Sequence, residues 1–333
     1  MTKVAVFSAG SWGTAFSVVL GDAGHDVVLW ARRDEIADAI NTKRENTEYL
    51  PGIELPATVR ATTDAAEAAA DADVVVLTVP SQTLRANLTA WGSALPASAA
   101  VVSLMKGVEL GTTKRMSEVI AEVGGVEQER IVIVSGPNLA REIAVKQPAA
   151  SVVASSSRAM AELVAAACAA PYFRPYTGAD VVGTEICGAV KNVIALAVGM
   201  AEGLGMGDNS KASIITRGLA ETMRLGMALG GEAPTFAGLA GVGDLIATCM
   251  SPLSRNHSFG VRLGQGLAVS EVIAVTKQTA EGVKSCTSIL ELARNTGVDV
   301  PIIEQVDAMI QHDRSAQEVV SALLSRPRKA ETA

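Results

Sequence analysis

One lysine lies in the middle of the most apolar segment of the chain. The residues from Gly183 to Leu204 are apolar on nearly every helical face, which predicts a buried helix with Lys191 and Asn192 at its centre. No polar stripe leads from Lys191 to water. Burial would lower the pKa of its ammonium, which makes a lysine usable as a base near neutral pH. The alternatives are an ammonium that reaches water along its stem and one that pairs with a remote carboxylate for structural reasons.

Two later segments combine polar side chains with predicted helix starts. Asp244 follows the turn Gly241-Val242-Gly243 and begins a short predicted helix with Thr248 one turn on, so both side chains can face one point. Ser254-Arg255-Asn256 precedes another helical stretch and offers N–H groups, a guanidinium and an amide to one anion. We interpret this group as suited to a phosphate. Asp244 could equally cap its helix, and Arg255 alone would be an ordinary surface arginine.

Two further segments of this kind follow predicted strands directly. Lys106 and Gly107 come after one strand, and Gly136 and Asn138 come after the next. In doubly wound sheets, ligands bind at the carboxyl ends of strands. We therefore expect these residues to lie beside a ligand.

The N-terminus carries a partial dinucleotide-binding pattern. A predicted strand ends at Phe7, and the turn that follows contains Gly10 and Gly13 before a predicted helix. Gly10 would let the backbone approach a pyrophosphate, Gly13 would let the helix pack closely on the strand, and the helix N-terminus would receive the anion. Ser8 replaces the first glycine and adopts positive φ less readily, so we expect weakened cofactor affinity. The alternative is a turn that binds no ligand.

An arginine pair stands where NAD-binding proteins carry a carboxylate. About 20 residues beyond the glycines, an acidic residue would accept hydrogen bonds from the ribose hydroxyls of NAD. This chain has Arg32 and Arg33 there. A guanidinium can pair with the 2′-phosphate of NADP, so the pattern favours NADP(H), with NAD(H) as the other cofactor considered. The alternative is a solvated arginine pair.

The elements that position these residues fall into two halves. Short β-branched runs alternate with helical segments up to about Ser155, and after Phe173 long helical segments take over. We predict an α/β fold, with a Rossmann-type doubly wound dinucleotide-binding domain at 1–180 and an all-helical substrate and catalytic domain at 181–333. The predicted strands are Lys3–Phe7, Asp26–Trp30, Val74–Val79, Ala100–Leu104, Ile131–Val134 and Ser151–Ala154.

Composition excludes several classes of function. A formal net charge of -7 argues against wholesale binding to nucleic acid or to anionic membranes. The first residues lack the apolar run of a secretory signal, and Lys191 and Asn192 interrupt the longest apolar stretch, so we predict a cytoplasmic protein without membrane insertion. The four cysteines are widely spaced, which indicates free thiols and no metal site. Only three histidines are present, which disfavours a dehydrogenase that uses histidine as its base.

Taken together, these segments resemble bacterial NAD(P)-dependent glycerol-3-phosphate dehydrogenases along nearly the whole chain. The similarity is carried by Gly10-Ser11-Trp12-Gly13-Thr14-Ala15, Lys106-Gly107, Ser135-Gly136-Pro137, Gly188-Ala189-Val190-Lys191-Asn192, Ile215-Thr216-Arg217-Gly218, Gly241-Val242-Gly243-Asp244, Ser254-Arg255-Asn256 and Glu281-Gly282. The combination is specific, although each motif alone is not. Two departures are Ser8 and Cys187, which stand where glycine is common; Cys187 could crowd the active site.

The resemblance implies roles for particular residues. Lys191 would be the proton acceptor, supported by Asp244 and Thr248, and Asn192 is counted with them among the candidate catalytic residues. The implied substrate contacts are Lys106, Gly136, Asn138, Ser254, Arg255 and Asn256. The implied cofactor contacts are Ser11, Trp12, Arg32, Lys106, Ala140, Arg255, Thr279 and Glu281.

The predicted activity is reversible hydride transfer between sn-glycerol 3-phosphate and dihydroxyacetone phosphate, which supplies the glycerophospholipid backbone. One rival is a dehydrogenase of the same plan that acts on another small phosphorylated or acidic alcohol, or on a nucleotide sugar through Cys249 as a nucleophile. Another is a nucleotide-binding redox sensor. The broad helical half is suited to a homodimer.

Overall fold

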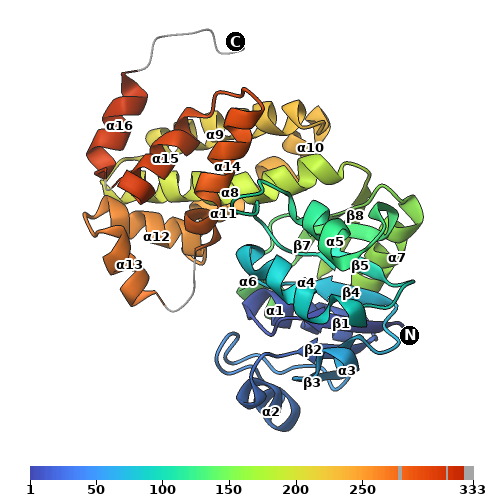
Figure 1. Cartoon of the computed structure of the whole chain (residues 1–333). Helices are drawn as coiled ribbons and strands as arrows, with labels where there is room; N and C mark the ends of the chain where they lie inside the picture. The colour runs from blue at the N-terminus through green and yellow to red at the C-terminus, as the bar shows by residue number, and fades with distance from the viewer. Residues whose placement is uncertain (277–279, 313, 326–333) are drawn as a thin grey trace.

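The N-terminal half is built on one eight-stranded sheet (Figure 1). In this computed structural model the described residues are 1–276, 280–312 and 314–325. The strands lie in the order β3-β2-β1-β4-β5-β6-β7-β8, and all neighbours are parallel except β6 and β7. Their bounds are β1 Lys3–Phe7, β2 Asp26–Trp30, β3 Val59–Thr62, β4 Val74–Leu77, β5 Ala100–Ser103, β6 Ile131–Ser135, β7 Ala149–Ala154 and β8 Phe173–Gly178.

Helices cover both faces of this sheet because its strands are apolar on both sides. In β1, Val4 and Val6 belong to the core shared with α1, α2, α6 and α7, whereas Ala5 and Phe7 belong to the core shared with α3, α4 and α5. The doubly wound prediction is therefore confirmed. These helices are α1 Ser11–Asp22, α2 Asp34–Lys43, α3 Ala65–Ala69, α4 Leu84–Trp91, α5 Met116–Gly124, α6 Ala140–Ala144 and α7 Arg158–Cys168, with short 3₁₀ turns η1 Ser81–Thr83, η2 Gly92–Ala94 and η3 Gln128–Arg130.

The six predicted strands are present, but two others were missed. The missed strands, β3 and β8, are the two edges of the sheet. β3 has four residues and alternates buried with exposed positions, and β8 carries Pro175 with only Phe173 fully buried. Edge strands pack on fewer neighbours, so they lack the continuous apolar run by which the inner strands were recognised.

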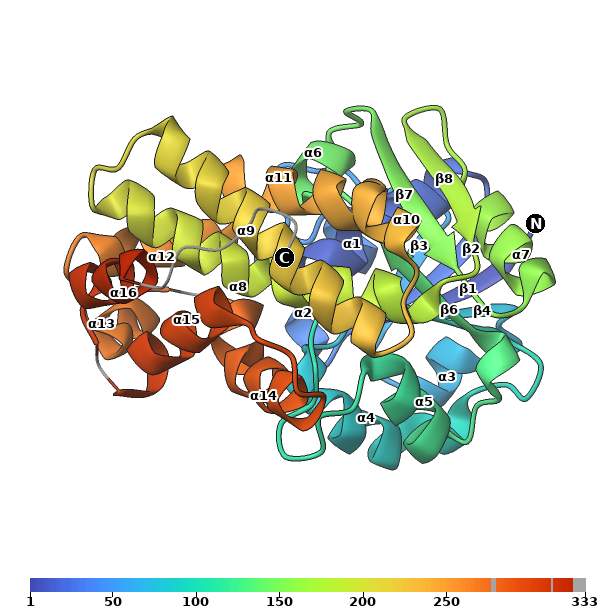
Figure 2. The same ribbon diagram turned by 90° about the horizontal axis from the view of Figure 1, so that it is seen from above.

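The C-terminal half consists of helices around one central helix, α8 (Figures 1 and 2). The predicted all-helical architecture is confirmed for the described residues. The helices are α8 Val181–Gly203, α9 Asp208–Ala228, α10 Ala233–Ala237, α11 Asp244–Met250, α12 Arg255–Gly264, α13 Val269–Val275, α14 Glu281–Asn295, α15 Pro301–His312 and α16 Ala316–Leu324, with one π-helical turn, η4 Leu239–Gly243.

Glycines allow α12 to lie directly against α8. A Cβ added to Gly199 of α8 would lie 2.1 Å from the carbonyl oxygen of His257, and one added to Gly260 of α12 would lie 2.2 Å from that of Leu196. The two backbones are therefore in contact. This close approach fixes the start of α12 relative to the middle of α8.

α8 is apolar because it is a core helix. It is long and apolar enough to cross a membrane, but 89% of its apolar window is buried inside the protein.

The first half of α8 also binds the sheet domain through a buried ion pair. Arg115 Nη1 lies 2.7 Å from Glu185 Oε2, and both the N–H and the hydroxyl of Ser117 donate to the same carboxylate. These contacts fix α8 relative to the start of α5.

Candidate active site at the junction of the two domains

Lys191 is buried and hydrogen-bonded to two groups of α11. Its side chain points from α8 to Asp244 and Thr248, and the residue is only 7% exposed. Lys191 Nζ donates to Asp244 Oδ1 and, at 2.6 Å, to Thr248 Oγ1. The structure thus brings together three residues that sequence analysis grouped. Asp244 is the first residue of α11 and makes no cap hydrogen bond, so its alternative interpretation as a helix cap is wrong.

A second lysine reaches the same carboxylate from the sheet domain. Lys106 follows β5, and its Nζ donates to Asp244 Oδ2 at 2.6 Å and to the Gly136 carbonyl at 3.2 Å. The carboxyl ends of β5 and β6 therefore meet α8 and α11 at one point. Asp244 lies between two ammonium groups, which leaves an excess of positive charge beside it for an anionic ligand.

The surroundings of Lys191 bring the pKa of its ammonium down toward neutral pH. Burial lowers the pKa of Lys191, and the positive charge of Lys106 acts in the same direction, whereas Asp244 opposes both. Thr248 Oγ1 accepts a hydrogen bond from the ammonium. A lysine in such a position can exchange a proton with a ligand near neutral pH.

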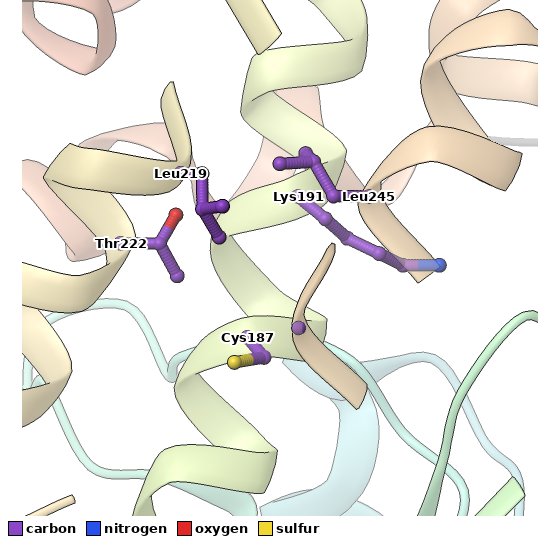
Figure 3. A pocket seen from close by; sticks show the side chains of 6 residues that line it. Cys187, Lys191, Leu219, Thr222 and Leu245 are labelled. Atoms are coloured by element: carbon purple, nitrogen blue, oxygen red, sulfur yellow. The ribbon is translucent and has the colours of Figure 1, made fainter. Parts of the chain in front are cut away.

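Cys187 lies on the other side of Lys191 from the ammonium. A small pocket is lined by Cys187, Leu219, Thr222 and the stem of Lys191, and Figure 3 shows the sulfur and the ammonium pointing in opposite directions. Cys187 packs with Phe236 and Ala240. It therefore does not crowd the ammonium. All four cysteines are free and buried.

Cys249 is poorly placed to act as a nucleophile. It is fully buried in α11, and this burial raises the pKa of its thiol to about 12. The thiolate, not the thiol, is the reactive form. This observation weighs against the nucleotide-sugar alternative.

Asn192 and Asn256 connect α8, α12 and α14. Asn192 Oδ1 accepts from Asn256 Nδ2 at 2.9 Å, and Asn256 Oδ1 accepts from the N–H of Gly282 at 2.9 Å. Asn192 Nδ2 also lies 3.4 Å from the Lys106 carbonyl oxygen. Asn256 is thus partly engaged within the protein, which sequence analysis did not anticipate. The chain of amides orders the loop of Lys106.

The start of α12 presents the predicted anion-binding group. Ser254 is the N-cap, and its Oγ accepts from the N–H of His257 at 3.2 Å. Arg255 is the first helical residue and is exposed. A guanidinium at the N-terminus of a ten-residue helix is a favourable place for a phosphate.

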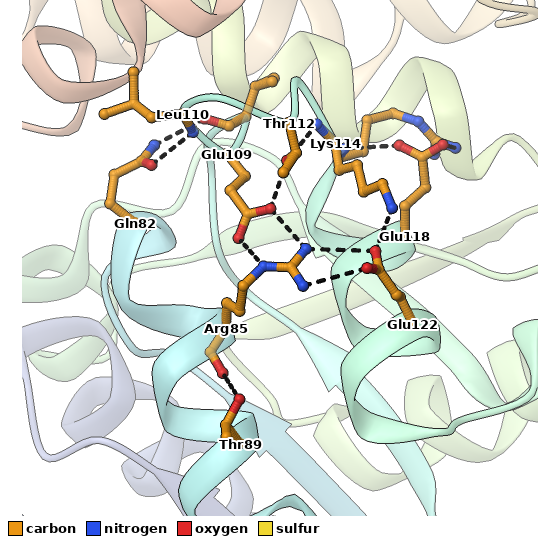
Figure 4. Close-up of polar contacts among 11 residues, drawn as sticks. Gln82, Arg85, Thr89, Glu109, Leu110, Thr112, Lys114, Glu118 and Glu122 are labelled. Carbon is orange, nitrogen blue, oxygen red and sulfur yellow. Dashed lines mark hydrogen bonds and ion pairs between the residues drawn. The ribbon is translucent and has the colours of Figure 1, made fainter.

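The loop after Lys106 is held by side chains that sequence analysis missed. Gln82 donates to the Val108 carbonyl at 2.8 Å and accepts from the N–H of Leu110 at 2.9 Å. Arg85 binds both carboxylate oxygens of Glu109 at 2.9 Å and also contacts Glu122, as Figure 4 shows. These contacts join η1 and α4 to the loop. No local pattern predicts them, because the partners are 24 to 37 residues apart.

The turn between β1 and α1 has the geometry that a dinucleotide needs. A Cβ on Gly13 would lie 2.1 Å from the Ser8 carbonyl oxygen, so only glycine lets α1 pack there. A Cβ on Gly10 would meet just Ser8 Oγ, at 3.6 Å, so this side of the turn is open. Trp12 Nε1 is buried and has no acceptor among the described residues. Open backbone, a helix N-terminus and an orphan donor fit a bound dinucleotide.

Ser8 adopts the conformation that a glycine would supply. Its φ is 114°, a region that side chains rarely occupy. Its N–H donates to the Trp30 carbonyl at 3.2 Å, and its own carbonyl accepts from Thr78 Oγ1 at 3.1 Å, so contacts on both sides impose this conformation. The turn is preserved despite the serine, and its effect on cofactor affinity stays a prediction.

We expect Ser8→Gly to stabilise the protein. Relief of the strained backbone should outweigh the extra flexibility of glycine in the unfolded chain and leave a gain of about 1 kcal/mol. Thermal unfolding would measure it as a higher Tm. Ser93→Gly is the matched control, since Ser93 is exposed and lies outside the positive-φ region. A Tm that falls equally in both variants would contradict the strain.

The other predicted cofactor residues lie on the same side of the sheet domain or at the start of α14. Arg32 and Arg33 are exposed directly after β2, and Ala140 is the first residue of α6. Glu281 begins α14, and its Oε2 accepts from Ser81 Oγ at 2.7 Å. Ser11 donates through Oγ to the Tyr49 carbonyl at 2.8 Å. Thr279 lies outside the described residues.

Two buried polar groups near Lys106 have free hydrogen-bonding capacity. Asn138 Oδ1 accepts from Ser151 Oγ at 2.6 Å, but its Nδ2 has no acceptor within residues 1–276, 280–312 and 314–325. The Ser135 hydroxyl, at the end of β6, also has no partner in this part of the chain. Buried polar groups are nearly always satisfied, so these two are available to hydrogen-bond a ligand.

Comparison with known proteins identifies the family. The model of the NAD-dependent glycerol-3-phosphate dehydrogenase N-terminus matches residues 3–161, and that of its C-terminus matches residues 180–321. The chain belongs to this family. Curated relatives named glycerol-3-phosphate dehydrogenase [NAD(P)+] include those of Streptomyces coelicolor, 62% identical over 99% of this chain and 98% of the relative, and Corynebacterium glutamicum, 55% identical over 99% and 100%.

Solved structures of the family share the fold. The glycerol-3-phosphate dehydrogenase of Coxiella burnetii is 34% identical, with a TM-score of 0.92 over 98% of this chain and 99% of that one. A ketopantoate reductase from Ralstonia eutropha, 18% identical over 96% of this chain and 99% of that one with a TM-score of 0.60, shares the architecture alone. The chain is therefore an oxidoreductase of the NAD(P)-dependent glycerol-3-phosphate dehydrogenase family.

Proposed function

We propose that this chain interconverts sn-glycerol 3-phosphate and dihydroxyacetone phosphate with NAD(H) or NADP(H), in the cytoplasm, and so supplies the glycerophospholipid backbone. The observation that carries the proposal is a buried cluster in which Asp244 binds both Lys191 and Lys106 of the sheet domain, while Thr248 accepts from Lys191. Relatives with 55 to 62% identity bear the name of this activity. We place the boundary between the cofactor and catalytic domains at residues 180 and 181, where α8 begins.

The dinucleotide, when bound, accepts or supplies a hydride at its nicotinamide ring. Gly10, Ser11, Trp12 and Gly13 would hold its pyrophosphate, and Arg32 and Arg33 would bind its adenosine ribose. Ala140, Lys106, Arg255 and Glu281 complete the contacts. The free Trp12 Nε1 and the open side of Gly10 support this assignment.

The phosphate of the substrate is bound at the start of α12. Arg255 provides charge and two parallel donors, while the helix N-terminus provides N–H groups. Ser254 and Asn256 flank this point. Lys106, Gly136 and Asn138 hold the carbon chain from the sheet domain, and the free Nδ2 of Asn138 can donate to a substrate oxygen.

Lys191 transfers the proton. In the oxidative direction its neutral Nζ accepts the proton of the C2 hydroxyl as hydride leaves C2. In the reductive direction the ammonium returns this proton to the carbonyl oxygen. Asp244 and Thr248 hold Nζ in place, and Asp244 stabilises the charge that forms on it. Asn192 orders the adjoining loop.

The test of this function is oxidation of NADH and NADPH by the purified protein. We expect oxidation that depends on dihydroxyacetone phosphate and is absent with dihydroxyacetone, which lacks the phosphate. Equal rates with the two ketones, or rates at background with both, would contradict the proposed substrate. Sedimentation of the same sample tests the predicted homodimer.

Arg255→Ala should chiefly raise the KM for dihydroxyacetone phosphate, because it removes a charged hydrogen-bonding group from the phosphate. We expect roughly a tenfold to hundredfold increase, as is typical for hydrogen bonds to charged groups. Initial-rate kinetics with both substrates measure it. Arg262→Ala, in the last turn of the same helix, is the control. An unchanged KM would remove the phosphate assignment.

A further inference from the structure

The segment after α2 is fixed against the dinucleotide turn. Asn46 is fully buried, and its Nδ2 donates to the Ala9 carbonyl and to Thr14 Oγ1, both at 2.8 Å. Three residues on, the Tyr49 carbonyl accepts from Ser11 Oγ at 2.8 Å. Both ends of the short stretch 46–49 are thus bound to the turn and the first residues of α1. The residues between them are therefore held close to the start of α1, where the proposed dinucleotide would bind.

Glu48 lies between these two anchors. Its Oε2 is 2.6 Å from Arg33 Nη2, and the Tyr49 hydroxyl is 3.5 Å from the same nitrogen. Arg33 follows the end of β2, where dinucleotide-binding folds read the adenosine ribose. The side chains of Arg33 and Glu48 are 42% and 47% exposed. A ligand can therefore reach both partners of this ion pair.

The two partners suit two different ligands. A carboxylate accepts hydrogen bonds from the ribose hydroxyls of NADH, and a guanidinium pairs with the 2′-phosphate of NADPH. Arg32 and Arg33 stand where that carboxylate would follow β2, and the fold brings Glu48, from 15 residues further along the chain, to Arg33. The site thus holds both recognition groups, paired with each other.

We infer that Glu48 is a specificity-determining residue that lets one site accept both NADH and NADPH. With NADH, Glu48 accepts a ribose hydroxyl and Arg33 keeps its partner. With NADPH, Arg33 turns to the 2′-phosphate, and Glu48 repels that phosphate. An exposed ion pair changes a binding constant by only about fivefold or less, so neither cofactor is excluded. This inference rests on the proposed dinucleotide site.

The test is binding of NADH and NADPH to Glu48→Gln, measured by isothermal titration without substrate. Glutamine keeps the size of the side chain, and the exposed position leaves the fold intact. We expect NADPH to bind more tightly and NADH more weakly, so that the ratio of their Kd values shifts by roughly three- to tenfold. The shift should shrink at high salt, because exposed charges are screened.

Two further variants sharpen the result. Glu54→Gln removes the same charge from an exposed position of the same connection and should leave the ratio unchanged. Arg33→Met should weaken NADPH binding more than NADH binding. A Kd ratio that is equal in Glu48→Gln and the native protein overturns the inference while the dinucleotide site stands. A native protein that binds neither cofactor overturns both.

Discussion

Lys191→Met should lower kcat in both directions by about 10²- to 10⁴-fold, the usual contribution of a positioned proton-transfer group. Methionine retains the apolar stem that lines the pocket with Cys187, Leu219 and Thr222, and removes only the ammonium. Asp244 keeps its contact with Lys106, so no carboxylate is left buried without a cation. The Kd of NADPH, measured by titration without substrate, should change little.

Lys211→Met is the matched control. Lys211 lies on α9 with a side chain only 15% exposed, and it forms ion pairs with Glu202 and Asp208. Its loss should lower stability slightly and leave turnover unchanged. Near-normal turnover of Lys191→Met would assign the buried lysine a structural role. A parallel loss of NADPH binding would indicate a disordered site and not a missing proton carrier.

Asp244→Asn should damage both stability and catalysis. It leaves two ammonium groups facing a neutral amide, and breaking a buried ion pair in this way costs about 3 kcal/mol or more. Asp244 raises the pKa of Lys191, so its removal lowers that pKa further. Less ammonium is then present at neutral pH, and reduction of dihydroxyacetone phosphate should fall by roughly 10²-fold, more than the oxidative reaction does.

A buried aspartate elsewhere in the helical domain serves as the control for Asp244. Asp307 of α15 accepts from Thr287 Oγ1 at 2.7 Å and is 8% exposed. Asp307→Asn should lower Tm modestly and leave the ratio of the oxidative rate to the reductive rate unchanged. If Asp244→Asn slows both directions equally, the carboxylate does not act through the protonation of Lys191.

The parts of the fold that sequence analysis recovered are those encoded locally. The inner strands are continuous apolar runs, and α8 is an apolar segment of helical length. The grouping of Asp244 with Thr248 followed from one helical turn. The contact of Lys106 with Asp244 spans 138 residues, and only the resemblance to a family placed both in one site.

The features that sequence analysis missed depend on contacts between residues that lie far apart in the sequence. The sequence around Glu48 did not predict a role for it at the cofactor site. Nothing near it in the sequence predicts that Asn46 and Tyr49 bind the turn between β1 and α1. Ser81 and Gln82 likewise act through α14 and the Lys106 loop. The conformation of Ser8 was judged from its type alone, whereas the surrounding hydrogen bonds decide it.

The pH dependence of kcat/KM in both directions tests the central claim, proton transfer by Lys191, most directly. Burial lowers the pKa of Lys191 from 10.5 to about 7. Oxidation of glycerol 3-phosphate needs neutral Lys191, so its rate should rise with pH up to about 7 and level off above it. Reduction needs the ammonium and should decline above the same pH. A pH profile that changes slope only near the ordinary pKa of lysine would contradict the account. So would a change of slope near pH 7 that persists in the residual activity of Lys191→Met.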